Sequence, residues 1–159
     1  MDLINFIEKR KVKNTQIRVY VTEAKKTCTL YFNSEYVYSK EEALEALGLD
    51  IDFLDQLIED FVVQILQSNK KFLKYLVKFK EDKKNNIALD FSQFQELVHK
   101  NLGVARNLRI KDVEEVLACL MSTKDVEEIH RLLHVLEACT IVLHPCKSYD
   151  TLLMTQHQL

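Results

Sequence analysis

Between residues 51 and 143, apolar residues recur at intervals of three and four, the spacing that places them on one face of an α-helix. One long apolar stripe runs through residues 54–79, and shorter stripes occupy residues 94–108, 113–120 and 126–143. Four substantial helices joined by short connections bury such stripes best against one another. The spacing therefore predicts a mainly α fold, an antiparallel four-helix bundle.

The first 38 residues follow a different pattern. Residues 16–21 alternate polar and apolar side chains and are rich in β-branched residues, and residues 27–32 are the expected return strand. Residues 35–38 can add a third short strand. We therefore expect residues 1–38 to form an appendage, a short helix followed by a β-hairpin or small meander. Because an isolated hairpin is marginal in water, it should pack on the helices or on a second copy, and its edge strands favour a homodimer.

Local signals set the limits of the helical domain, which we place at residues 39–145. Ser39 and Glu42 have the spacing of a capping box at the start of a helix. Pro145 closes the domain, because the residue before a proline is pushed out of the helical region. The remaining residues, 146–159, show no clear period and are expected to form a loose tail.

Composition narrows the function classes. The 159 residues are 47% hydrophobic and 29% charged, as in an ordinary globular domain. A net charge of -2 gives no global attraction to nucleic acid or to an anionic membrane, and no apolar run approaches the roughly 18 residues that span a bilayer. With two glycines, the chain lacks a phosphate-cradling glycine-rich loop. Four scattered cysteines without paired spacing make a reducing cytoplasm the simplest compartment.

The most unusual position is Gly103, which falls inside the helix expected over residues 91–108. Glycine in a helix interior costs about 1 kcal/mol relative to alanine. Gly103 follows His99 by four residues, so the missing side chain lies one turn beyond the imidazole on the same face. The gap would let another molecule approach a ring nitrogen of His99. Alternatively, Gly103 simply ends a helix begun at Phe91, and His99 is an ordinary surface histidine.

Three further side chains accompany His99. A neutral, exposed imidazole can accept a phosphoryl group, and a nearby cation would stabilise the phosphoryl oxygens. Arg106, seven residues on, returns to nearly the same side of the helix, whereas Lys100 points about 100° round it. Gln95, one turn before His99, can orient the ring.

The segment His99-Lys100-Asn101-Leu102-Gly103-Val104-Ala105 resembles the histidine phosphotransfer (HPt) motif, in which the histidine is followed four residues later by glycine and six residues later by a small residue. Upstream, residues 42–50 followed by residues 53–61 are similar to the opening of many such domains. The resemblance covers residues 40–143. Two positions depart from the motif: Leu102 replaces the usual lysine, and Arg109 replaces a frequent second glycine.

The resemblance implies a phosphocarrier of a two-component phosphorelay, without catalytic activity or a cofactor of its own. His99 would take a phosphoryl group from a receiver domain or a histidine kinase and pass it on. Gly103 would give access, Arg106 or Lys100 would replace the missing lysine, and Leu102 would help to dock the receiver. Any Mg²⁺ would be held by the receiver's acids. An HPt-like adaptor that is never phosphorylated is the alternative.

A metal site is a weaker hypothesis. His130 and His134 are four residues apart, which can place two imidazoles on one metal ion. No third ligand accompanies them in the sequence.

Overall fold

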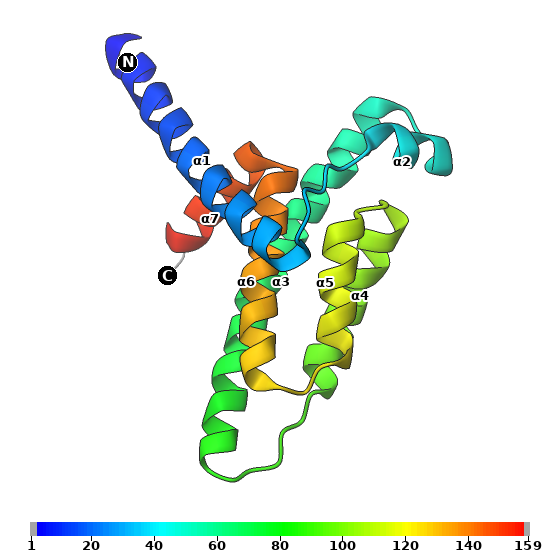
Figure 1. Cartoon of the computed structure of the whole chain (residues 1–159). Coiled ribbons are helices and arrows are strands. Elements are labelled where there is room, and N and C mark those ends of the chain that lie inside the picture. Colours follow the sequence, from blue (N-terminus) through cyan, green and yellow to red (C-terminus); the bar gives the residue numbers. More distant parts are fainter. Residues whose placement is uncertain (1–2, 158–159) are drawn as a thin grey trace.

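A computed structural model describes residues 3–157, except for the side chains of residues 6 and 154–157. Over residues 3–157 the chain contains helices and no strand (Figure 1). None of the described helices has the length and apolarity needed to cross a membrane. In chain order, the helices are α1 (Leu3–Phe32), α2 (Lys40–Leu47), α3 (Ile51–Lys84), α4 (Ser92–Asn107), α5 (Lys111–Ser122), α6 (Val126–Leu143) and α7 (Pro145–His157).

Helices α3, α4, α5 and α6 form a four-helix bundle, as the apolar spacing predicts. The long helix α3 packs against α4 and α6, and α5 completes the ring by packing against both (Figure 1). Consecutive helices run in opposite directions. The short helix α2 lies against α3 at the far end from the α3–α4 loop.

Aromatic rings fill one end of the bundle core. Phe94 of α4 is fully buried, and its ring centroid lies 5.3 Å from that of Phe72 and 5.6 Å from that of Phe79, both on α3. The rings meet edge to face, the geometry that aromatic quadrupoles favour. This cluster fixes the way α4 sits on α3.

A serine cap sets where α2 begins, and a glycine sets where it ends. The Ser39 hydroxyl accepts a hydrogen bond from the Glu42 amide, which confirms half of the expected capping box. The Glu42 carboxylate instead pairs with Lys111 of α5. Gly48 ends α2 in the left-handed region, at φ 65°, a conformation in which a residue with a Cβ is strained.

The expected N-terminal hairpin is wrong, because α1 is one continuous helix of 30 residues that contains both predicted strands. The residues that contact the bundle follow helical spacing: Val21, Ala24 and Cys28 pack with Ala138 and Ile141 of α6. Val19 and Leu30, which contributed to the apparent alternation, are exposed to solvent. No edge strand exists in residues 3–157, so the expectation of a homodimer through a hairpin falls with it.

Residues 33–39, where a third strand was expected, form an irregular linker. Two tyrosines tie it to the turn between α4 and α5. The Tyr38 hydroxyl donates to the Leu108 carbonyl oxygen at 2.6 Å, and the Tyr36 hydroxyl accepts from the Lys111 amide at 3.1 Å. The linker is therefore fixed to the bundle by hydrogen bonds instead of strand pairing.

The C-terminal tail is also ordered, contrary to expectation. Pro145 ends α6 as predicted, but it also occupies the first helical position of α7, where its fixed φ and missing N–H are tolerated. The Ser148 hydroxyl is buried and donates to the Thr140 carbonyl oxygen at 3.0 Å. Helix α7 packs against α1, α3 and α6, and Asp150 of α7 pairs with Lys13 of α1 at 2.8 Å. The last two residues, 158–159, lie outside the described part.

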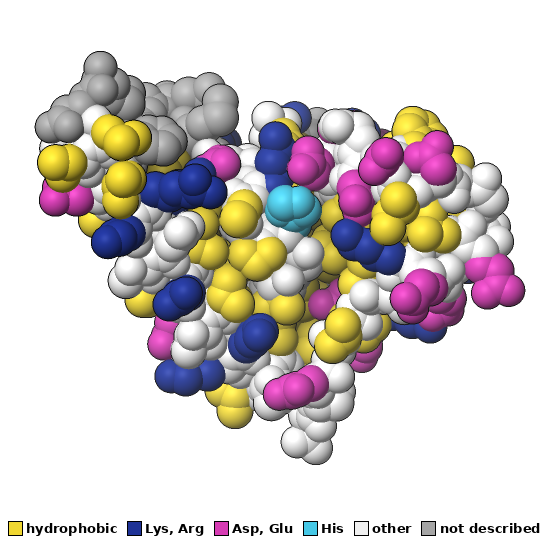
Figure 2. All heavy atoms as spheres, turned by 90° about the horizontal axis from the view of Figure 1, so that it is seen from above, with side chains coloured by type: hydrophobic (Ala, Val, Ile, Leu, Met, Phe, Trp, Pro, Cys, Tyr) yellow, Lys and Arg dark blue, Asp and Glu magenta, His cyan; other side chains and the backbone are white. Residues whose placement is uncertain are grey.

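Although the net charge is only -2, positive and negative side chains are concentrated on different parts of the surface. Figure 2 shows Lys and Arg side chains on the side of α1, Asp and Glu side chains on the side of α2 and the start of α3, and apolar side chains between them. Helix α1 carries seven Lys and Arg against two Glu, whereas residues 40–60 carry eight Asp and Glu against one Lys. Local fields of this kind act on partners even where the net charge does not.

The aromatic cluster yields a test of the bundle. Phe94→Ala should lower the free energy of unfolding by about 3–5 kcal/mol, because it removes a fully buried ring and leaves a cavity. Phe53→Ala is the matched control: Phe53 is 51% exposed and should cost less than about 1 kcal/mol. Urea denaturation measures both, and equal losses would contradict the packing described.

Candidate functional site

The helix α4 carries His99 in its middle. It runs from Ser92 to Asn107 and therefore continues past Gly103, so the alternative in which Gly103 ends the helix is wrong. One face of α4 is buried, through Phe94, Val98, Asn101, Leu102 and Ala105. His99 lies on the other face, and its side chain is exposed.

The surface next to His99 is open at Gly103. A Cβ built on Gly103 would meet no heavy atom within 4 Å outside its own helical turn. The backbone there is ordinary right-handed helix, so nothing in the local conformation requires glycine. What the glycine provides is space, one turn beyond the imidazole.

Two of the neighbours expected around His99 are hydrogen-bonded to α5. The Gln95 amide nitrogen donates to the Met121 carbonyl oxygen at 3.3 Å, near the end of α5. The Arg106 Nε donates to the Glu114 carboxylate at 3.2 Å. Lys100 is exposed, a quarter-turn away from His99. His99 therefore sits between two links that hold α4 against α5.

Leu102 does not take the role expected of it. Its side chain is 4% exposed and belongs to the bundle core. It stands where the HPt motif has a lysine, and here that position faces inward. Leu102 therefore contributes packing under the site, and the expectation that it docks a partner is corrected.

A buried polar network lies beneath the site, and sequence reasoning missed it. Asn101 is fully buried; its amide nitrogen donates to the Ser68 hydroxyl at 3.0 Å and to the Leu97 carbonyl oxygen at 2.9 Å. Its amide oxygen accepts from Gln64 at 3.1 Å. A satisfied buried network fixes one relative rotation of two helices, because any other rotation leaves polar groups unpaired. The signal in the sequence was a polar residue between two core positions, Val98 and Leu102.

The histidine pair considered for a metal is not supported. His130 Nδ1 lies 3.1 Å from the Lys80 ammonium nitrogen, which would repel a metal ion at that atom. Within the described residues, no three His, Cys, Asp or Glu side chains come together in a way that could hold a metal.

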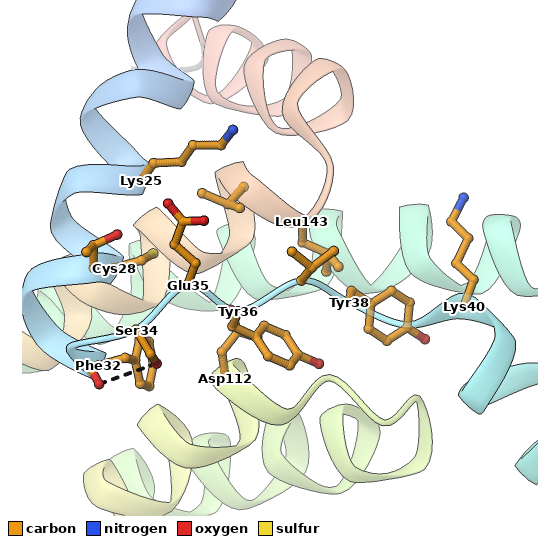
Figure 3. A pocket seen from close by; sticks show the side chains of 13 residues that line it. Lys25, Cys28, Phe32, Ser34, Glu35, Tyr36, Tyr38, Lys40, Asp112 and Leu143 are labelled. Atoms are coloured by element: carbon orange, nitrogen blue, oxygen red, sulfur yellow. Dashed lines mark hydrogen bonds between the residues drawn. The ribbon is translucent and has the colours of Figure 1, made fainter.

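A second feature, a cavity of about 350 Å³, was not expected from the sequence. It lies between α1, the linker 33–39, the start of α5 and the end of α6 (Figure 3). Apolar and aromatic side chains, among them Phe32, Tyr38 and Leu143, form much of its wall, and Lys25, Glu35 and Lys40 also line it. Residues from four separate stretches of sequence meet here, which is why no local pattern predicted it.

Asp112 is the one acid that α5 contributes to this cavity. It accepts a hydrogen bond from the Val113 amide at 2.8 Å, but burial dominates and raises its pKa from 3.8 to about 6. The carboxyl group therefore stays protonated to a much higher pH than an exposed aspartate does.

Comparisons of this chain with protein-family models, with curated proteins and with solved structures found no match. The geometry around His99 and the cavity beside α1 are therefore the grounds for any functional conclusion.

The two glycines should respond in opposite ways to alanine. Gly103→Ala should raise the free energy of unfolding by about 0.5–1 kcal/mol, because the added methyl group meets open space and alanine favours the helix. Gly48→Ala should lower it by about 1–2 kcal/mol, since Gly48 has φ +65°. Urea denaturation of the two variants checks both signs. A destabilised Gly103→Ala protein would mean that the space beside Gly103 is occupied.

Asp112 predicts a pH dependence of stability. Because its pKa is raised in the folded state, the native chain binds more protons than the unfolded chain between pH 4 and 6, so stability should fall as the pH rises through this window. The loss at pH 7 should be up to about 3 kcal/mol. In Asp112→Asn this component is absent. The unfolding free energy of the variant minus that of the parent should therefore increase from pH 4 to pH 7. A constant difference would show that Asp112 is solvated.

Proposed function

We propose that this chain is a phosphocarrier of a two-component phosphorelay, in which His99 accepts a phosphoryl group from a receiver aspartate or a histidine kinase and passes it on. The observation that carries the proposal is the exposed imidazole in the middle of α4, beside a glycine where an added side chain would meet nothing. A phosphoryl acceptor needs this arrangement, because donor and acceptor must approach in line over a fixed surface.

Hydrogen bonds to two neighbouring helices, α3 and α5, make the site on α4 rigid. The Asn101 network holds α4 against α3, and the Gln95 and Arg106 hydrogen bonds hold it against α5. A nucleophile on such a support loses little entropy on reaction. Mg²⁺ and the acidic groups of the transfer reaction would be supplied by the receiver domain.

The cation for the phosphoryl oxygens is Arg106 in this proposal, with Lys100 as the second choice. Arg106 now pairs with Glu114, but both side chains are partly exposed, and such surface pairs contribute at most about 1 kcal/mol. A phosphoryl group carries more charge than one carboxylate, so the guanidinium can exchange its partner at small cost. The proposal places the protein in the cytoplasm, together with its kinase and receiver.

A second candidate is an adaptor of the same shape that binds a receiver and is never phosphorylated. The inward side chain of Leu102 and the Arg106–Glu114 pair favour it, because the position of the motif lysine offers no cation and Arg106 already has an acidic partner. In that role His99 is a contact residue, and its imidazole chemistry is not used.

Phosphoryl transfer from a partner tests the proposal. Receivers charged with radiolabelled phosphate, or an active histidine kinase, should place acid-labile, base-stable label on the parent chain, and His99→Gln should abolish it. His134→Gln is the control, since His134 is also an exposed helical histidine. Gly103→Leu should slow the transfer about 100-fold while keeping the fold, because it fills the approach to the ring.

The outcomes separate the two candidates. If His99→Gln takes label as well as the parent does, the phosphocarrier proposal is wrong. If a receiver binds the parent and His99→Ala equally well and neither chain takes label, the adaptor is the better description.

A further inference from the structure

Two cysteines far apart in the sequence face each other across helices. The Sγ atoms of Cys28 on α1 and Cys139 on α6 lie 3.7 Å apart. Cys139 is fully buried, whereas Cys28 is partly exposed. All four cysteines of the chain are free thiols, and no sequence spacing links this pair.

The cavity beside α1 gives access to one member of the pair. Cys28 lines it and Cys139 does not, so a small molecule that enters the cavity meets the Cys28 sulfur first (Figure 3). Asp112 lines the same cavity, and the neighbouring Cys139 thiol lowers the pKa of its carboxyl group against the larger effect of burial. Cys28 and Asp112 therefore border the cavity, whereas the Cys139 sulfur is buried beside Cys28.

The two thiols have unequal acidity. The hydrogen bond from the Cys139 thiol lowers the pKa of Cys28 by stabilising its thiolate. The same hydrogen bond, followed by burial, raises the pKa of Cys139. The proton therefore stays on the buried sulfur, and the accessible sulfur is the one with thiolate character, which is the reactive form.

We propose that Cys28 and Cys139 are a hydroperoxide-sensitive thiol pair that closes to a disulfide between α1 and α6. In the first step, the Cys28 thiolate attacks one oxygen of the hydroperoxide; an S–O bond forms, the O–O bond breaks, and the leaving hydroxide or alkoxide takes a proton. In the second step, the Cys139 sulfur attacks the Cys28 sulfenic acid; an S–S bond forms, the S–O bond breaks, and water leaves. Asp112 takes the Cys139 proton and returns it to the departing hydroxide. Two thiols and one hydroperoxide thus give one disulfide, water and water or an alcohol.

The geometry asks for little movement. In a disulfide the two sulfurs lie about 2.05 Å apart. The Sγ atoms of Cys28 and Cys139 now lie 3.7 Å apart, and the cavity leaves room for the Cys28 side chain to turn toward Cys139. The bond would anchor α1, which packs on α6 and α7, covalently to the bundle. This proposal is independent of the role of His99.

Peptide mapping after mild oxidation tests it, with Cys146→Ser as the reference protein. Trypsin leaves Cys28 in the peptide 27–40, but it leaves Cys139 and Cys146 together in the peptide 132–147, so removing the exposed Cys146 makes the assignment unique. The reduced full chain is freed of reductant, treated with a slight excess of hydrogen peroxide, denatured, blocked with a maleimide and digested.

The expected result is that Cys146→Ser falls from three free thiols to one and yields peptide 27–40 linked to peptide 132–147. The same background with Cys28→Ser or with Cys139→Ser should give no linked peptide, and the monomer mass should be unchanged throughout. If Cys146→Ser keeps its three thiols under peroxide, or if the lost thiols appear in links between chains, the proposal is overturned. Because Cys146 is exposed, its removal leaves the fold intact and the reference measurement stands whatever the other variants do.

Discussion

The burial of one face of α4 is the constraint on which the rest of the site depends. Phe94, Val98 and Ala105 are completely removed from water between α3 and α5. Each large apolar side chain buried in this way contributes about 1.5–3 kcal/mol, so a rotation of α4 that exposed them would cost more than the domain can spare. With that face fixed, residues on the remaining face must point to solvent, and His99 and Gly103 are among them. Asn101 adds direction to this packing, because its hydrogen bonds are satisfied in one rotation only.

The helices of the bundle could be predicted from the sequence because their apolar faces are wide and regular. Each stripe in α3, α4, α5 and α6 continues for three turns or more, and no β pattern competes with it. The exposure of His99 was implied by the resemblance to the HPt motif, and His99 lies outside the apolar stripe that α4 buries. The role given to Leu102 failed because the HPt resemblance assigns a position by its offset from the histidine, whereas burial is decided by the angle around the helix.

The N-terminal region was mispredicted because two periods overlap there. Residues 16–21 alternate polar and apolar over six positions, too short a window to separate a strand from a helix. The contacts that settle the matter are Val21, Ala24 and Cys28 on α6, more than 100 residues away in the sequence. The cavity and the Cys28–Cys139 contact could not be predicted for the same reason: both exist only once α1 lies against α6. The tail had no visible period because α7 is held partly by polar contacts such as Ser148 to Thr140.

The central claim is that His99 is a phosphoryl acceptor on the solvent side of a fixed helix, and a small donor tests it without knowledge of the partner. The imidazole NMR spectrum of the folded protein, recorded before and after incubation with phosphoramidate, resolves the five histidines, with His99→Gln identifying the signal of His99. The account predicts that the His99 ring alone acquires a coupling to phosphorus. If the His99 signal stays unchanged, or if a different histidine is modified in its place, the claim is contradicted.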